Sequence, residues 1–259
     1  MKTVSIKKID IGQGLPKICV PLMGDTDEKI LCEMTAILEA ADEYNVDIIE
    51  FRGDYYKKLN DFSSLRSIME KLQAMAKNKI LLFTIRSEKE GGEKLAFTSP
   101  AINEINRFVI ENGLGDIVDV ELMSGEKAVK DLIELAHKRG VRIIMSYHNF
   151  HTTPSMDEMV NCLVRMQKSG ADIAKIAVMP NSKEQVLELL KATRYMQKYH
   201  PDTPVVAISM GTLGALSRVT GEIFGSAITF ATLGAGSAPG QLSAKKVKDC
   251  LELIDKYFV

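Results

Sequence analysis

The segment VRIIMSYHNFHTTPSMDEMVNCLVRMQKSGADIAKIAVMP, residues 141–180, contains two strand-like runs separated by one helix-like run. The first run, 141–150, and the last, 172–180, are almost continuously apolar, which is typical of parallel strands buried on both faces. The run between them, 155–170, has apolar residues at helical spacing and ends in a lysine, a serine and a glycine, as helix C-termini often do. The segment is therefore predicted to form a strand, a helix and a parallel strand.

The same alternation extends along the whole chain. Six further strand candidates occupy 18–24, 46–54, 80–86, 116–123, 204–211 and 226–234. No linker rich in Pro, Gly or Ser interrupts the pattern, so one domain is predicted over residues 1–259. Eight strand–helix units in a chain of this length favour an α/β fold of the (β/α)₈ barrel type. A doubly wound open sheet is the alternative, but no GxGxxG motif follows the first strand.

The composition is that of an ordinary globular protein, with 46% hydrophobic and 26% charged residues. The 33 basic and 34 acidic residues are spread along the chain and give a formal net charge of −1, so no nucleic acid is expected as a partner. No run approaches the ~20 apolar residues of a membrane helix. The first twelve residues alternate apolar and polar residues, which predicts an amphipathic hairpin and not a signal peptide. We therefore expect a soluble cytoplasmic protein without a membrane partner.

The cysteines and histidines do not have the spacing of a metal site. The four cysteines are far apart and are predicted to be reduced thiols in the core: Cys19, Cys32, Cys162 and Cys250. His148 and His151 are three residues apart, but no HExxH motif and no third ligand accompany them. No metal is predicted.

Lys175 lies inside the strand-like run 172–180, where a charged side chain has to be explained. Burial of an ammonium group costs several kcal/mol, so such a lysine finds a carboxylate, reaches water or loses its proton. A neutral lysine amine can attack a carbonyl group to form a Schiff base. A lysine that extends past the end of the strand into water is the alternative.

In a (β/α)₈ barrel the functional groups come from the C-terminal ends of the strands and the loops that follow them. Polar side chains at those positions are Glu50, Arg52, Arg86, Glu90, His148, Lys175, Arg218, Ser237 and Gln241. A lysine, a histidine and several arginines at one rim favour Schiff-base chemistry on a small carboxylated or phosphorylated carbonyl compound. Two alternatives remain for these residues. Glu50 and Arg52 could form only a structural ion pair. The segment 234–241 could bind a phosphate group instead of forming a mobile lid.

Six motifs follow one another along the chain: EFRGD at 50–54, TIRSEKEGGE at 84–93, SYHNFHTTPS at 146–155, DIAKIAVMPNS at 172–182, SRVTGEIFGSAITF at 217–230 and SAPGQ at 237–241. In this order they resemble the motifs of type I 3-dehydroquinate dehydratase, a Schiff-base enzyme of the shikimate pathway. The resemblance covers the chain from its beginning to its C-terminus without large gaps.

The resemblance implies a (β/α)₈ barrel with an N-terminal β-hairpin that closes its bottom. It also implies a homodimer that dehydrates 3-dehydroquinate to 3-dehydroshikimate without metal or organic cofactor. This reaction is the third step of the shikimate pathway, which serves aromatic amino acid biosynthesis. Carried over by motif, Lys175 forms the imine, His148 transfers protons, and Glu90 orients His148 and raises its basicity. The sequence leaves open whether the chain serves biosynthesis or quinate degradation.

The resemblance also implies the groups that bind the substrate. Arg218 is expected to pair with the carboxylate, assisted by Ser237 and Gln241 from the lid, while Glu50, Arg52 and Arg86 hold the ring hydroxyls. Pro21 stands where relatives often have a serine, so no substrate contact is predicted there. Two alternatives stay open at this point, a class I aldolase acting on a phosphorylated sugar and a non-enzymatic binding protein on the same fold.

Overall fold

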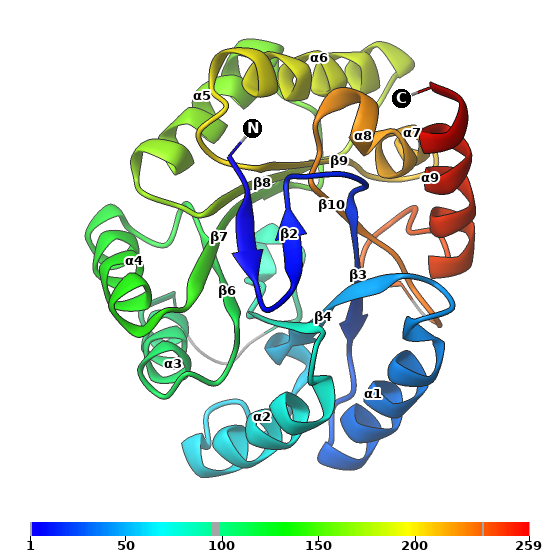
Figure 1. The fold of residues 1–259 in the computed structure, drawn as a ribbon. Coiled ribbons are helices and arrows are strands. Elements are labelled where there is room, and N and C mark those ends of the chain that lie inside the picture. The colour runs from blue at the N-terminus through cyan, green and yellow to red at the C-terminus, as the bar shows by residue number, and fades with distance from the viewer. Residues whose placement is uncertain (1, 95–98, 235, 259) are drawn as a thin grey trace.

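A computed structural model describes residues 2–94, 99–234 and 236–258 as a ring of parallel strands surrounded by helices (Figure 1). The barrel strands are β3 Lys17–Leu22, β4 Val46–Arg52, β5 Ile80–Thr84, β6 Ile117–Glu121, β7 Arg142–Asn149, β8 Ile173–Val178, β9 Val205–Ser209 and β10 Ile228–Phe230. The helices are α1 Asp27–Ala41, α2 Phe62–Ala76, α3 Ser99–Glu111, α4 Glu126–Arg139, α5 Met156–Lys168, α6 Lys183–Tyr199, α7 Ala215–Val219, α8 Gly221–Phe224 and α9 Ala244–Phe258. The 3₁₀ turns η1 Gly53–Tyr55 and η2 Glu88–Glu90 follow β4 and β5.

The sheet closes on itself, as the (β/α)₈ prediction requires. The strands follow one another in the order β10, β3, β4 and onward to β9, and β10 pairs in parallel with β3. At the remaining seam a parallel bridge joins Val205 to Ser226, and the amide of Ala227 donates to the carbonyl of Val205 at 2.8 Å. The open doubly wound sheet is therefore wrong.

The segment 141–180 forms the predicted unit of β7, α5 and β8. Ser155 caps α5 in a capping box with Glu158, and the chain leaves the helix through Gly170, whose φ of +93° lies in the left-handed region. Strands β7 and β8 pair in parallel with Ser146 opposite Lys175. The connection thus places the histidine-bearing and lysine-bearing strands side by side.

The predicted N-terminal hairpin is present and lies across the barrel at the end where the strands begin (Figure 1). Its strands β1 Val4–Ile6 and β2 Ile9–Ile11 are antiparallel, with Val4 opposite Ile11. Ile11 is fully buried and packs in one cluster with residues inside the barrel, among them Ile48 and Ile80. The hairpin therefore closes the bottom of the barrel with its apolar face.

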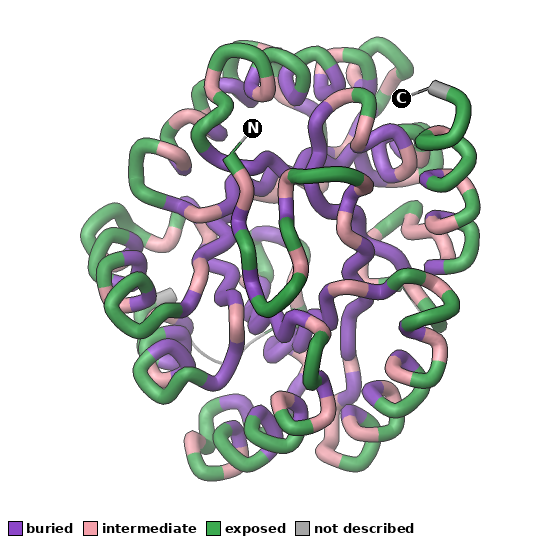
Figure 2. The backbone as a smooth tube through the Cα atoms, in the orientation of Figure 1, coloured by how far each residue is buried: buried purple, intermediate pink, exposed green. Residues whose placement is uncertain are grey.

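Burial follows the two layers of the fold (Figure 2). One core fills the interior of the barrel, and a larger core lies between the strands and the inward faces of the helices, where Leu65, Ile68 and Leu72 of α2 are fully buried. The prediction that all four cysteines lie in the core is wrong: Cys19 is buried, whereas Cys32 is exposed and the other two are half-buried. Cys32 lies on the outer face of α1, which packs on the barrel through other residues.

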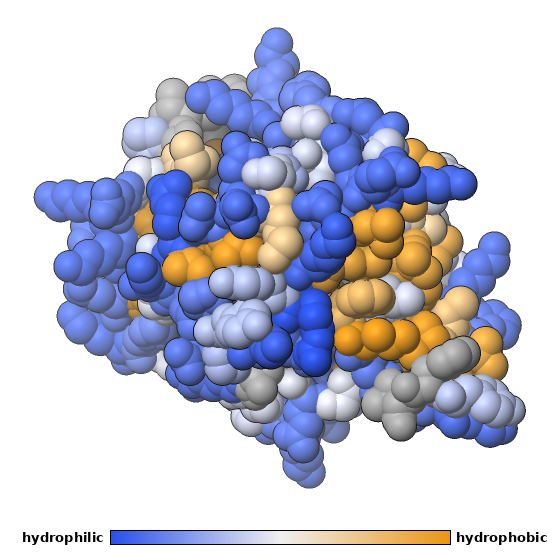
Figure 3. Space-filling view, turned by 90° about the horizontal axis from the view of Figure 1, so that it is seen from above, coloured by the Kyte–Doolittle hydropathy of each residue, from blue (hydrophilic) through white to orange (hydrophobic). Residues whose placement is uncertain are grey.

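Figure 3, which views the molecule from the side where α6 lies, shows apolar side chains gathered on this face. Exposed large apolar residues on α6 to α9 and the loop before α7 are Leu187, Tyr195, Tyr199, Leu213, Leu216, Ile223, Leu253 and Tyr257. Within the described part of the chain, no helix is both long enough and apolar enough to cross a membrane.

Candidate active site

A cavity lies at the C-terminal ends of the barrel strands. All nine residues that the sequence singles out contribute to its wall: Glu50, Arg52, Arg86, Glu90, His148, Lys175, Arg218, Ser237 and Gln241. The barrel topology explains this convergence, because parallel strands end at one rim and the loops that follow meet there.

Lys175 lies in β8 and is only 4% exposed, so the alternative of a lysine that extends into water is wrong. Its Nζ lies 3.6 Å from Oδ2 of Asp119 and 4.1 Å from the ring centroid of Phe230. The amine is thus held between a carboxylate and an aromatic face, inside the cavity wall.

His148 is held by Glu90. Oε2 of Glu90 lies 2.9 Å from Nδ1 of the imidazole and also accepts the main-chain amide of His148 at 3.0 Å. Glu90 reaches this position because the turn η2 packs against β7, and Gly91 after it has a φ of +82° and packs closely against Phe150. Nδ1 is occupied, so Nε2 is the ring nitrogen left to meet a molecule in the cavity.

The electrostatics of this pair differ from the expectation that Glu90 makes His148 more basic. Burial, and then the positive charges of Arg86, Lys175 and Arg52, hold the pKa of His148 well below its ordinary value. Burial and the neighbouring Glu121 raise the pKa of Glu90 to about 8 although Arg86 opposes them. The imidazole is therefore neutral at neutral pH, the form that can accept a proton.

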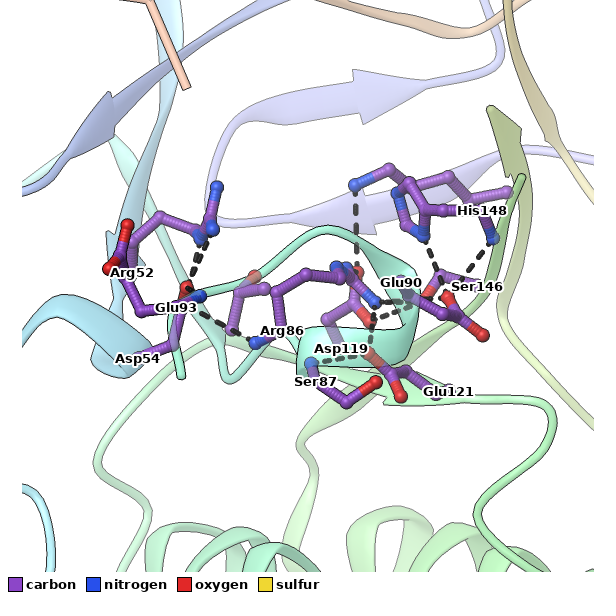
Figure 4. A network of polar contacts seen from close by, with 12 residues as sticks. Arg52, Asp54, Arg86, Ser87, Glu90, Glu93, Asp119, Glu121, Ser146 and His148 are labelled. Atoms are coloured by element: carbon purple, nitrogen blue, oxygen red, sulfur yellow. Dashed lines mark hydrogen bonds and ion pairs between the residues drawn. The ribbon is translucent and has the colours of Figure 1, made fainter. Parts of the chain in front are cut away.

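Arg86, which lines the cavity, lies at the centre of a network of polar contacts (Figure 4). Its guanidinium group donates to Oδ2 of Asp119 at 2.7 Å, to Oγ of Ser146 at 2.9 Å and to Oε1 of Glu121 at 3.1 Å. Sequence reasoning missed Asp119, Ser146 and Glu121. A signal existed, because Asp119 and Glu121 are two residues apart in a strand and therefore point to the same side.

The alternative that Glu50 and Arg52 form an ion pair with each other is wrong. Arg52 donates from Nε and Nη2 to the two carboxylate oxygens of Asp54, at 2.8 and 2.6 Å. Glu50 instead accepts the hydroxyl of Thr84 at 2.9 Å. Both side chains keep hydrogen-bonding groups available on the cavity wall, Nη1 of Arg52 and the second oxygen of Glu50.

Arg218, on the short helix α7, is 1% exposed and faces the cavity. It donates to the carbonyls of Pro239 at 2.9 Å and Phe230 at 3.4 Å, and among the described residues no carboxylate lies within 4.0 Å of it. Burial lowers the pKa of Arg218 to about 10. A buried cation that contacts only neutral groups is a ready site for an anion.

The segment after β10 lies over the cavity and contacts Arg218 through Pro239. Gln241 accepts the amide of Ser237 at 2.7 Å and donates to its hydroxyl at 3.0 Å. The amide of Gly211 donates to the carbonyl of Pro239 at 3.1 Å. Because the amide of Ser237 already donates to Gln241, it is not available to bind a phosphate group, which weakens the phosphate-site alternative. Residue 235, within the predicted lid, lies outside the described residues.

In the portion of the chain that the structure describes, no three His, Cys, Asp or Glu side chains gather in a way that could hold a metal ion. His151 is exposed, whereas His148 contacts the buried Glu90. The two histidines of the SYHNFH motif thus have different environments, and the cavity offers an amine, an imidazole and guanidinium groups.

The chain is similar to known proteins over nearly its whole length. The family model described as Type I 3-dehydroquinase matches residues 18–257. A 3-dehydroquinate dehydratase of Clostridium kluyveri is 42% identical over 255 residues, which cover 98% of each protein. A 3-dehydroquinate dehydratase of Salmonella typhimurium is also 42% identical, over 98% of this chain and 99% of the relative.

Solved structures agree with these sequence similarities. The crystal structure of a type I 3-dehydroquinate dehydratase of Clostridium difficile with covalently modified comenic acid is 40% identical, with a TM-score of 0.93 over 98% of each chain. The 3-dehydroquinate dehydratase of Geobacillus kaustophilus is 34% identical, with a TM-score of 0.94 over 100% of this chain and 98% of the other. The family match over residues 18–257, relatives of this identity and the same barrel establish that the chain belongs to the type I 3-dehydroquinase family.

Proposed function

We propose that the chain dehydrates 3-dehydroquinate to 3-dehydroshikimate through an imine between the substrate ketone and Lys175, with His148 as the general acid and base. Family membership supports the reaction, and it removes the support for the aldolase and binding-protein alternatives. One observation supports the mechanism most strongly: the buried Nζ of Lys175 lies in the wall of a cavity that His148 and Arg218 also line. No carboxylate of the described residues pairs with Arg218.

The imine has a clear chemical purpose. The hydrogen next to a ketone is a weak acid, and a protonated imine in place of the ketone accepts the electron pair that its removal leaves, giving an enamine. The amine of Lys175 adds to the carbonyl carbon, and water leaves as the C=N bond forms. After elimination of the substrate hydroxyl, water hydrolyses the imine and returns Lys175 to its starting form.

His148 would perform the proton transfers at Nε2. A neutral imidazole removes the hydrogen, and the imidazolium so formed protonates the departing hydroxyl. Glu90 fixes the ring and its tautomer, because one carboxylate oxygen accepts both Nδ1–H and the main-chain amide of His148. The lowered pKa of His148 favours the neutral form with which this cycle begins.

The remaining predicted residues would hold the substrate. Arg218 suits the carboxylate, since its guanidinium offers two parallel hydrogen bonds and meets no carboxylate of the described chain. Ser237 and Gln241 would close over the same end of the substrate, which excludes bulk water. Glu50, Arg52 and Arg86 would contact the ring hydroxyls with the hydrogen-bonding groups that their protein partners leave available.

The test compares two variants by the absorbance of the conjugated product. Lys175→Ala should abolish turnover, whereas His148→Ala should still form an imine and release product slowly. Lys191→Ala, an exposed lysine on α6, is the matched control and should have normal activity. Substantial dehydratase activity in Lys175→Ala would overturn the mechanism. The homodimer also stays a prediction, which sedimentation equilibrium tests.

A further inference from the structure

We propose that Asp119 is a positioning residue for Lys175 and keeps the imine nitrogen protonated while the substrate reacts. The inference rests on the imine mechanism proposed above and adds a residue to it. Asp119 comes from β6, two strands away from Lys175 on β8, and its carboxylate extends into the barrel interior beneath the cavity.

The geometry gives Nζ of Lys175 one carboxylate neighbour. Oδ2 of Asp119 lies 3.6 Å away, and among the described residues no other carboxylate oxygen lies within 4.0 Å of Nζ. Both side chains are buried, that of Asp119 completely and that of Lys175 to within 5%. The ring of Phe230 lies against the amine from another direction. A cation formed at this nitrogen therefore has Asp119 as its counter-ion.

Asp119 is itself firmly held. Oδ1 accepts the hydroxyl of Ser146 at 2.5 Å, and Oδ2 accepts Nη2 of Arg86 at 2.7 Å. Burial opposes ionisation, but Arg86, Lys175 and the hydroxyl of Ser146 outweigh it and lower the pKa of Asp119 below its ordinary value. The carboxylate is therefore charged at neutral pH, and two hydrogen bonds orient it.

The other charges around Lys175 explain why a counter-ion is needed. The charged and titratable groups that share the cavity or act on its neighbours are Cys19 on β3, Asp47, Glu50 and Arg52 on β4, Asp54 on η1, Arg86 after β5, Glu90 on η2, Asp119 and Glu121 on β6, His148 on β7 and Arg218 on α7. Three arginines among them repel a proton on the imine nitrogen. Without Asp119, an imine at this place would lose that proton at lower pH and would no longer accept electrons.

The effect on rate is a balance of two opposing contributions. A carboxylate near the nitrogen increases the protonated fraction of the imine, but it also opposes the loss of positive charge when the enamine forms. The change in kcat is therefore an ambiguous measure of the role. The pH at which the imine loses its proton is not ambiguous, because only the first contribution affects it.

The experiment measures that pH directly. The His148→Ala protein, in which the imine is expected to accumulate, is mixed with 3-dehydroquinate between pH 6 and 10 and then treated with cyanoborohydride, which reduces protonated imines. Intact mass gives the reduced fraction, and peptide mapping locates the adduct. The midpoint is the pH at which half of the maximum reduced fraction is obtained. Adding Asp119→Asn to the His148→Ala protein should lower this midpoint by about one to three pH units, the shift expected when a neighbouring charge is removed.

Two further variants separate charge from structure. Ser146→Ala in the same background removes a hydrogen bond to Asp119 but keeps its charge, so the midpoint should stay close to that of the background. The exchange Asp119→Ser with Ser146→Asp returns a carboxylate to the strand position opposite Lys175 and should move the midpoint back up. This exchange also tests the charge if Asp119→Asn does not fold.

The outcomes distinguish this inference from the proposed function. An adduct on Lys175 whose midpoint does not move in Asp119→Asn, or does not return in the exchange, would overturn the role of Asp119 and leave the imine mechanism standing. A background protein that gives no adduct on Lys175 at any pH would overturn the imine mechanism and the role of Asp119 with it.

Discussion

One oxygen of Glu90, Oε2, fixes His148 twice, through the imidazole Nδ1 at 2.9 Å and through the main-chain amide at 3.0 Å. A side chain that holds both the ring and the backbone of its partner restricts where Nε2 can point. The relationship therefore determines which nitrogen faces the cavity.

The pH dependence of the reaction should show this environment. Burial and the charges of Arg86, Lys175 and Arg52 lower the pKa of His148, so the neutral base persists as the pH falls below ~6.5, the usual value for histidine. We expect kcat/KM to hold between about pH 6.5 and 6 and to decline only at lower pH, where the imidazole gains a proton. The assignment would be contradicted if kcat/KM fell on the acid side with a midpoint above pH 6.5 and the residual activity of His148→Ala did not show the same fall.

Substitution of Arg218 tests the proposed carboxylate site. Arg218→Lys keeps a positive charge but loses the paired donors, so KM should rise by about 10- to 150-fold, equivalent to about 1.5–3 kcal/mol for a charged hydrogen bond. The exposed Arg194→Lys on α6 is the control and should behave as the unmodified protein. Steady-state kinetics measure KM for both variants, and an unchanged KM in Arg218→Lys would count against the binding of the substrate carboxylate by Arg218.

The lid rests on a close approach of two glycines. Gly240 has a φ of +75°, and a Cβ added to it would lie 2.3 Å from the carbonyl oxygen of Gly211. Gly240→Ala should therefore keep the lid from seating and raise KM at least about fivefold, since strain of about 1 kcal/mol or more is added. Gly234→Ala, where a Cβ meets nothing within 4 Å, is the matched control. Equal KM values for Gly240→Ala and Gly234→Ala would contradict the proposal that the lid packs against Gly211 through Gly240.

The hairpin that closes the barrel should matter for stability and not for chemistry. Ile11 is fully buried among the residues at the bottom of the barrel, so Ile11→Ala should lower the free energy of unfolding by about 2–5 kcal/mol with kcat unchanged. The exposed Ser5→Ala in the same hairpin should change it by less than about 0.5 kcal/mol. Urea denaturation measures both, and a loss of kcat in folded Ile11→Ala would tie the hairpin to the site.

The architecture could be predicted from sequence because buried parallel strands are continuous apolar runs that stand out between amphipathic helices. Strand ends were less predictable: the run at 226–234 gives only the three residues of β10, because apolar residues continue past the last ladder hydrogen bonds. The cavity wall was predictable for a related reason, since every polar residue at a strand end of a barrel is brought to one rim.

The interactions between those wall residues could not be predicted in the same way. Arg52 pairs with Asp54 and not with Glu50, because the chain turns at η1 and brings the carboxylate of Asp54 back to the guanidinium group. The lowered pKa of His148 depends on its burial and on charges from three other strands and loops. Such effects arise from three-dimensional proximity, which no local pattern in the sequence records.

The central claim is that Lys175 forms an imine with the substrate, and one measurement tests it most directly. The intact mass of the protein is recorded after addition of 3-dehydroquinate and then borohydride, and the adduct is located by peptide mapping. The account predicts one reduced adduct per chain, on Lys175, and none in Lys175→Ala. Folded protein that turns over substrate without an adduct, or an adduct on another lysine that persists in Lys175→Ala, would contradict it.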